Sequence, residues 1–395
     1  MKIYIQIILC SCYLVTNAQQ FEAGKIIDSL SIDKHQTETF TLYLPSTYNS
    51  KRAFPIVFIF SPSGNGKRGV ETFIKSAEVS EFILVCSNNA RNGSLKQNLN
   101  IAQRLFNHVF SNFNILENRI YLAGFSGGAR LATAIASASN QIEGVIACGA
   151  GFISDPNYMP ADPNFSYVGL CGERDINYRE MFDVKNYLDQ LNFHNTLFIF
   201  DGKHQWPTDE QLLLAFNWLE MEAIRKGHTT KSLHEIRELY SMDLSKATTM
   251  EKNNQLLIAS QHFDRIINTY HSYFNLDTVR QRLLNLEKSK DYSNSLKNRN
   301  KAFEKEEELN LYFSKRFDED YSEPNKNNLK WWAREFGKID KRKLKSNTQI
   351  IKMYERVRFK IFVTAYTISN QSNSNMSQEQ KEFCKSLISL VQSKH

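Results

Sequence analysis

Two hydrophobic patterns divide this chain at about residue 226. Before that point, short apolar runs end in turns rich in Gly, Ser and Pro, and they alternate with amphipathic stretches such as Leu95–Phe113. The continuous apolar run Arg52–Phe60 predicts a strand covered on both faces. The alternating stretches Gly24–Asp33 and Glu38–Leu44 predict antiparallel edge strands. The first part therefore predicts a domain in which strands and helices alternate.

After residue 226, glycine and strand-like runs become rare, and apolar residues recur at helical spacing. The segments with this spacing are Leu239–Tyr273, Leu276–Asp291, Ser295–Phe317, Leu329–Lys338, Thr348–Ser369 and Ser377–Gln392. A chain of 395 residues is also long for one domain. We expect an α/β domain over residues 19–226 and an all-α domain over residues 232–395.

The stretch Ile120–Arg130 predicts a strand, a sharp turn and a helix around the sequence Gly124-Phe-Ser-Gly-Gly128. Glycine at positions 124 and 128 lets strand and helix approach closely, and the turn exposes the hydroxyl of Ser126. The N–H of Gly127 at the start of the helix is free to donate to a developing oxyanion. Ser126 is therefore a candidate nucleophile.

Two further apolar runs follow Ser126, and each ends in a glycine-containing turn with a candidate partner residue. The first, Tyr167–Asp175, ends with a carboxylate, and the second, Leu197–His204, ends with a histidine. With this order of nucleophile, acid and base, residues 21–226 resemble the α/β-hydrolase superfamily, and more narrowly the secreted dienelactone-hydrolase-like and feruloyl- or polyester-esterase-like serine hydrolases.

The resemblance implies a doubly wound, mostly parallel sheet and a catalytic triad of Ser126, Asp175 and His204. It also implies cleavage of carboxylic esters, in small molecules or linked to a polymer, through an acyl-enzyme intermediate. It requires no cofactor and no metal.

Other interpretations of the candidate residues remain open. Asp175 precedes a predicted helix that either Asp175 or Asn177 is placed to cap. Asp201 is a rival acid, although it lies only three residues before His204. His204 itself has an alternative interpretation as a histidine of the core.

The loop after Arg52–Phe60 begins with Ser61-Pro62, where the resembled family usually has His-Gly. Because proline has no N–H, the alignment to the family pattern assigns the second oxyanion donor to the N–H of Ser63. An ordinary turn rich in Ser and Gly is the alternative.

Residues 1–18 have a basic start, an apolar run and the small-residue end Thr16-Asn17-Ala18, which predicts a signal peptide and a secreted or periplasmic location. Lipoprotein anchoring at Cys12 is the alternative. Three further cysteines (Cys86, Cys148 and Cys171) end predicted core strands, which favours buried free thiols over disulfides.

The helical half is basic, with 32 Lys and Arg against 21 Asp and Glu from Arg225 to His395. Since no nucleic-acid motif accompanies this charge, we expect a solvated surface and no nucleic-acid partner. The pieces Leu257–Phe263 and Ile266–Tyr270 loosely resemble one arm of a tetratricopeptide (TPR) hairpin. A protein partner could bind this half, where Trp331 and Trp332 either stack on a ligand or pack in the core.

Two other functions share the α/β sequence pattern. One is a serine peptidase of the prolyl-oligopeptidase kind, although only about 50 residues precede the strand Arg52–Phe60, whereas that kind carries a large N-terminal propeller. The other is an inactive hydrolase domain that serves as a binding scaffold.

Overall fold

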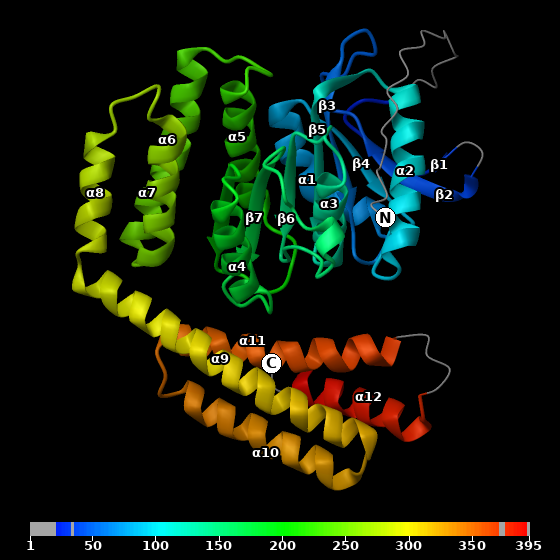
Figure 1. Cartoon of the computed structure of the whole chain (residues 1–395), viewed down its shortest axis with the longest axis vertical. Coiled ribbons are helices and arrows are strands. Elements are labelled where there is room, and N and C mark those ends of the chain that lie inside the picture. Colours follow the sequence, from blue (N-terminus) through cyan, green and yellow to red (C-terminus); the bar gives the residue numbers. More distant parts are fainter. Residues whose placement is uncertain (1–20, 33–34, 371–375, 393–395) are drawn as a thin grey trace. The chain divides into compact units, whose positions relative to one another are not determined.

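The computed structural model describes residues 21–32, 35–370 and 376–392 (Figure 1). The predicted signal peptide and Cys12 lie outside these residues. Within the part described, no helix is long and apolar enough to cross a membrane.

The described chain forms two compact units whose segments alternate along the sequence. The first unit runs to Gly172 and also includes Asn177–Ala247 and Asp264–Leu276. The second unit comprises Glu173–Ile176, Thr248–Phe263 and the residues from Asp277 onward. The boundary expected between residues 226 and 232 stays a prediction.

The first unit contains one eight-stranded sheet in the order β1-β2-β4-β3-β5-β6-β7-β8. β1 and β2 pair antiparallel, as do β2 and β4, and all other neighbours are parallel. This mixed, doubly wound order is that of the α/β-hydrolase fold and confirms the predicted fold class. The strands are β1 (Ile26–Ile32), β2 (His35–Tyr43), β3 (Phe54–Phe60), β4 (Ile83–Ser87), β5 (Ile115–Phe125), β6 (Gly144–Cys148), β7 (Ser166–Gly172) and β8 (Asn195–Phe200).

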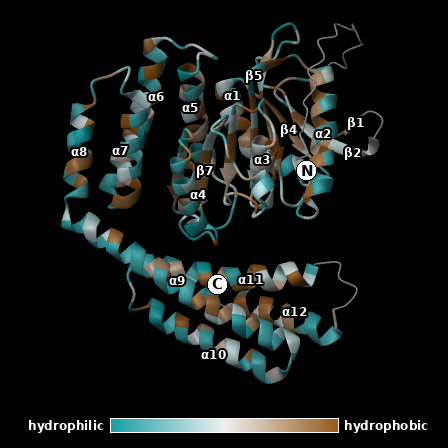
Figure 2. Cartoon of the chain, viewed as in Figure 1, coloured by the Kyte–Doolittle hydropathy of each residue, from teal (hydrophilic) through white to brown (hydrophobic). Residues whose placement is uncertain are grey.

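Helices cover both faces of the sheet. On one face α1 (Gly66–Ser80) and α5 (Asp209–Arg225) share a hydrophobic core with the strands. On the other face α2 (Leu95–Asn112), α3 (Gly127–Ser137) and α4 (Tyr178–Gln190) share a second core. Figure 2 shows hydrophobic residues gathered on the central strands between these helices. Burial on both faces explains why every residue of β3 is buried.

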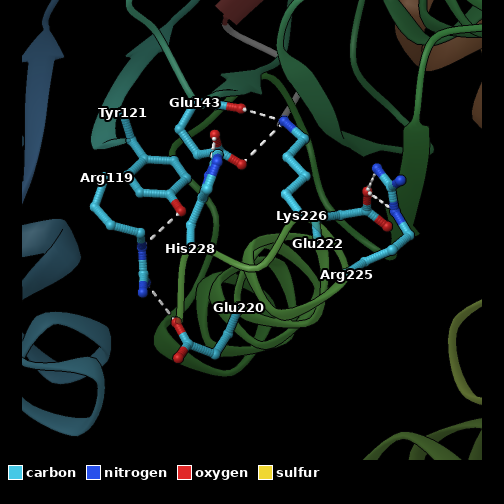
Figure 3. Close-up of polar contacts among 8 residues, drawn as sticks. All are labelled: Arg119, Tyr121, Glu143, Glu220, Glu222, Arg225, Lys226 and His228. Atoms are coloured by element: carbon cyan, nitrogen blue, oxygen red, sulfur yellow. Dashed lines mark hydrogen bonds and ion pairs between the residues drawn. The ribbon is translucent and has the colours of Figure 1, made fainter. Parts of the chain in front are cut away.

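Buried charges near the start of β5 and β6 are paired with the end of α5 and the residues after it (Figure 3). Arg119 donates to the Tyr121 hydroxyl at 3.1 Å and forms an ion pair with Glu220 at 2.5 Å. Glu143, 7 % exposed, is paired with Lys226 at 2.9 Å and lies 3.0 Å from His228. These contacts offset the cost of burying each charge and attach α5 to the sheet.

Two further helices, α6 (Leu233–Lys252) and α7 (Leu256–Tyr270), occupy the stretch Leu239–Tyr273, where the apolar spacing predicts helix throughout. The helix is interrupted because Asn254 adopts the left-handed conformation with φ 57°. In the second half of α7, Arg265 stacks on Phe198 of β8 at 3.7 Å and donates to the Thr196 hydroxyl at 2.9 Å. The end of α7 thus covers the last strand of the sheet.

The second unit has a helical core of its own. Its helices from residue 277 are α8 (Asp277–Glu287), α9 (Lys290–Ser322), α10 (Lys326–Lys343), α11 (Thr348–Asn370) and α12 (Gln378–Gln392). Trp332 is fully buried in this core, and its indole N–H donates to Asp320 at 2.9 Å. The core interpretation of Trp332 is therefore confirmed, whereas the TPR likeness stays a prediction.

The buried carboxylate of Asp243 in α6 predicts an unusual pH dependence of stability. Burial raises its pKa to about 6, against the opposing effects of a 2.8 Å hydrogen bond from the Tyr270 hydroxyl and the nearby charge of Arg265. Between the ordinary pKa near 3.8 and about 6, the folded state keeps a proton that the unfolded state has released. The contribution of this proton to the free energy of unfolding is complete below pH 3.8 and is lost as the pH rises through 6. The full loss is about 3 kcal/mol.

The test compares the free energy of unfolding in urea at pH 4.5 and pH 7. Asp243 should make the wild type more stable at pH 4.5 than at pH 7. In Asp243→Asn, the share of this difference that comes from Asp243 should disappear, because the amide does not titrate. The exposed Asp277→Asn serves as the control and should retain the wild-type difference. An unchanged difference in Asp243→Asn would contradict the prediction.

Candidate active site

Ser126 lies between β5 and α3 in a strained conformation, with φ 52° and ψ −120°. A positive φ is rare for a residue with a side chain, and it persists only where the surroundings enforce it. Here the Ser126 N–H donates to Cys148 of β6 at 2.8 Å, and the Ser126 carbonyl accepts from Ala129 at 3.0 Å. The hydroxyl forms no capping bond with the helix, so it remains available for chemistry.

Two glycines allow this turn to form. A Cβ at Gly124 would lie 2.3 Å from the carbonyl of Gly128, and a Cβ at Gly128 would lie 1.9 Å from the carbonyl oxygen of Phe60. Side chains at either position would push α3 away from β3 and β5. The close approach predicted from the sequence is therefore present.

His204 follows β8, and its Nε2 lies 3.0 Å from the Ser126 Oγ. The geometry is that of a base that accepts the serine proton, provided that Nε2 carries no proton. The imidazole packs on Phe125 with ring centroids 4.6 Å apart, and Phe125 in turn packs on Trp206 at 5.2 Å. The sequence pattern gave no reason to assign Phe125 or Trp206 a place beside the histidine.

The chain segments that lead to the candidate acid and to the histidine approach each other closely. A Cβ at Gly172, the last residue of β7, would lie 2.4 Å from the carbonyl oxygen of Gly202. Asp175 comes three residues after Gly172 and is 1 % exposed, whereas the rival Asp201 is exposed. A buried carboxylate requires partners, and an exposed one does not.

Asp175 is not the cap of the following helix. α4 begins at Tyr178, and its N-cap residue is Asn177. The Asn177 side chain does not cap the helix either, because it donates to the Gly149 carbonyl at 2.7 Å. The N-cap position is therefore that of Asn177, and the assignment of Asp175 as the acid stays a prediction.

The loop after β3 is a tight turn next to α3. Gly64 N–H donates to the Ser61 carbonyl at 3.1 Å, and the Ser61 and Ser63 hydroxyls lie 3.2 Å apart. Asn92 N–H donates to the Pro62 carbonyl at 2.9 Å, which links this loop to the loop after β4. The Asn92 side-chain oxygen also lies 1.9 Å from where a Cβ on Gly127 would be. Asn92 is a neighbour of the candidate site that no sequence pattern indicated.

A cavity of about 190 Å³ lies beside the nucleophile turn. Its lining combines apolar side chains with small and polar ones: Phe60, Leu131 and Ile153, then Ser61, Gly127 and Gly128, then Arg91, Asn92, Asn98 and Arg130. A larger cavity of about 520 Å³ includes Ala53, Leu116 and Arg119, near the starts of β3 and β5, and contains none of the predicted site residues. Parallel sheets of this kind bind ligands at the carboxyl ends of their strands, which favours the smaller cavity as the substrate site.

Arg130 on α3 fixes the rim of this cavity. It forms an ion pair with Glu180 of α4 at 2.7 Å and donates to the Phe152 carbonyl. The other oxygen of Glu180 accepts from the Gly151 N–H at 2.9 Å. The loop after β6 is thus held to two helices.

The four cysteines of the described chain are buried free thiols, as expected for Cys86, Cys148 and Cys171. Burial raises the pKa of Cys86 and of Cys148, so both remain protonated. Within residues 21–32, 35–370 and 376–392, no three His, Cys, Asp or Glu side chains form a group that could hold a metal ion.

No protein-family model matches the sequence, and no curated protein matches it. Among solved structures, the chain is similar to the fluorophosphonate-binding serine hydrolase F of Staphylococcus aureus, with 14% identity, a TM-score of 0.42, and coverage of 50% of this chain and 98% of that chain. It is similar to a ferulic acid esterase at 15% identity and a TM-score of 0.40, with coverage of 51% of this chain and 100% of that chain. It is also similar to a putative dienelactone hydrolase of Klebsiella pneumoniae subsp. pneumoniae at 15% identity and a TM-score of 0.37, with coverage of 51% of this chain and 98% of that chain.

Proposed function

We propose that this protein is a serine hydrolase that cleaves carboxylic esters with Ser126, His204 and Asp175. The observation that carries the proposal is the strained Ser126 turn with the serine hydroxyl 3.0 Å from His204 Nε2. A serine activated in this way is a nucleophile, whereas an ordinary surface serine stays protonated and unassisted. The order of the three residues along the chain supports the same assignment.

In the proposed reaction, the Ser126 oxygen attacks the ester carbonyl while His204 takes the serine proton. His204 then gives this proton to the leaving alcohol, and an acyl-enzyme remains. A water molecule deprotonated by His204 releases the acid product and restores Ser126. Asp175 holds the imidazole in the required tautomer and stabilises its positive charge.

The tetrahedral intermediate carries a negative oxygen that needs hydrogen-bond donors. The N–H of Gly127 is one of the first four of α3, which have no partner within the helix. We assign it as one donor, at the positive end of α3, and the N–H of Ser63 as the other. The reaction requires no cofactor.

The proposed substrate is an ester, free or attached to a polymer, that reaches Ser126 beside the cavity at the nucleophile turn. We also propose that the protein acts outside the cytoplasm, on the basis of the leader-like sequence of residues 1–18.

Labelling with a fluorophosphonate tests the proposal on the protein without residues 1–18. One equivalent should bind to Ser126, Ser126→Ala should bind none, and p-nitrophenyl butyrate should be cleaved faster than an aminoacyl anilide. The fully buried Ser76→Ala leaves the site unchanged and should label like the wild type. If the folded protein is not labelled, an inactive hydrolase domain that serves as a binding scaffold is indicated. If the protein prefers anilides, a serine peptidase of the prolyl-oligopeptidase kind is indicated.

A further inference from the structure

The segment Glu173–Ile176, which carries Asp175, is held by the helices of the second unit. Glu173 is 4 % exposed, and its carboxylate is paired with Lys352 of α11. One turn further along the same helix, Arg356 donates to the Glu173 carbonyl oxygen at 2.6 Å. α11 therefore holds both the side chain and the main chain of a residue two positions before Asp175.

Arg356 is itself fixed by a second acid. It is 1 % exposed, and its Nε lies 2.9 Å from both carboxylate oxygens of Glu306 on α9, a residue that is 4 % exposed. Two buried acids and two buried bases thus form one neutral cluster of Glu173, Lys352, Arg356 and Glu306. We call it the α11 clamp.

The next residue is held to the same helix. Arg174 forms an ion pair with Glu355 of α11 at 2.8 Å, and Glu355 also accepts from Lys343 of α10 at 2.9 Å. Each of the two residues before Asp175 therefore has an ionic partner on α11.

A cluster of this kind has little value for stability alone. Burying charged groups costs about as much free energy as their pairing returns, and well-packed apolar side chains often serve better. Its directional bonds can instead fix one conformation of a short segment, and the segment fixed here is the one that contains the proposed acid.

We propose that the α11 clamp is a positioning device for catalysis, in which Lys352 and Arg356 hold Asp175 where it orients His204. The inference rests on the proposed function and assigns a role to the helical unit. A catalytic group displaced by about 1 Å can lose about 100-fold in rate. The clamp residues act through Asp175 and need no contact with substrate.

The test replaces one pair of the clamp by uncharged side chains of similar size in the full chain. Arg356→Met/Glu306→Gln leaves no unpaired buried charge but removes the bond to the Glu173 carbonyl. We expect kcat for p-nitrophenyl butyrate to fall about 10- to 100-fold with KM nearly unchanged.

The control pair is on the same helix. Arg358 of α11 is 5 % exposed and forms an ion pair with Asp340 of α10 at 3.0 Å. Arg358→Met/Asp340→Asn should therefore match the clamp variant in chemistry while keeping kcat within about threefold. Equal losses in both variants would show that any disturbed helical core lowers activity, and the inference would be wrong.

A double-mutant cycle with Asp175→Asn separates positioning from general damage. If the clamp acts through Asp175, removing the clamp should not lower kcat further in a protein that already carries Asp175→Asn. Additive losses, or a loss that appears in KM and not in kcat, would overturn the inference. Full activity in Asp175→Asn itself would instead overturn the acid assignment in the proposed function.

Discussion

Asp175→Asn should lower kcat about 10⁴-fold without unfolding the protein. The amide is nearly the same size as the carboxylate, so the buried packing is kept, but it presents the wrong hydrogen-bond pattern to the imidazole. It also removes the negative charge that stabilises the imidazolium in the transition state. The measurement is the rate of p-nitrophenyl butyrate hydrolysis, with circular dichroism to verify the fold.

Asp201→Asn is the matched control, because Asp201 is the rival acid and lies only three residues before His204. This exposed carboxylate should be replaceable with a loss of less than about threefold, as is usual for a surface substitution. The reverse ranking of the two variants would transfer the role of the acid from Asp175 to Asp201.

Gly124→Ala should cost about 4 kcal/mol or more of unfolding free energy, or leave the protein unable to fold. The new Cβ would lie 2.3 Å from the backbone of Gly128, and a backbone atom in a packed turn cannot rotate out of the way. Urea denaturation measures the loss. Any folded fraction should also fail to react with a fluorophosphonate, because the turn can form only with α3 displaced.

Gly337→Ala makes the same chemical change at a position without this constraint. Gly337 lies inside α10, and a Cβ there would meet nothing within 4 Å. Since alanine favours a helix more than glycine does, this variant should gain about 0.5 to 1 kcal/mol. Equal effects at both glycines would show that the close approach at Gly124 is not what the turn requires.

The sequence was sufficient to predict the sheet and the nucleophile turn. β3 is a continuous apolar run, and β5 and β8 each end in one. Such runs are a local signal that needs no knowledge of the neighbours. The glycines of the turn are equally local, because their small size is required by the residues immediately around Ser126. His204 was predicted because it follows β8 directly.

The contacts that the sequence did not reveal join residues far apart in the chain. Nothing in the local pattern separates Arg356, which is buried, from the many exposed basic residues of the helical half. Arg265 is another example, since its place on Phe198 depends on how α7 packs. A charged residue shows no periodic signal for burial, and its partner is known only once the helices are in position.

The bond from Arg356 to Glu173 closes a stretch of 183 residues. Contacts so distant in sequence form late, because closing the long intervening loop costs conformational entropy before the contact can stabilise the chain. During synthesis, Ser126 and His204 have both left the ribosome long before α11 is complete. In the proposed arrangement, a partly made chain can assemble its nucleophile and base, yet it cannot fix its acid. In that arrangement, the proposed activity is complete only after α11 has been made and Arg356 has bonded to Glu173.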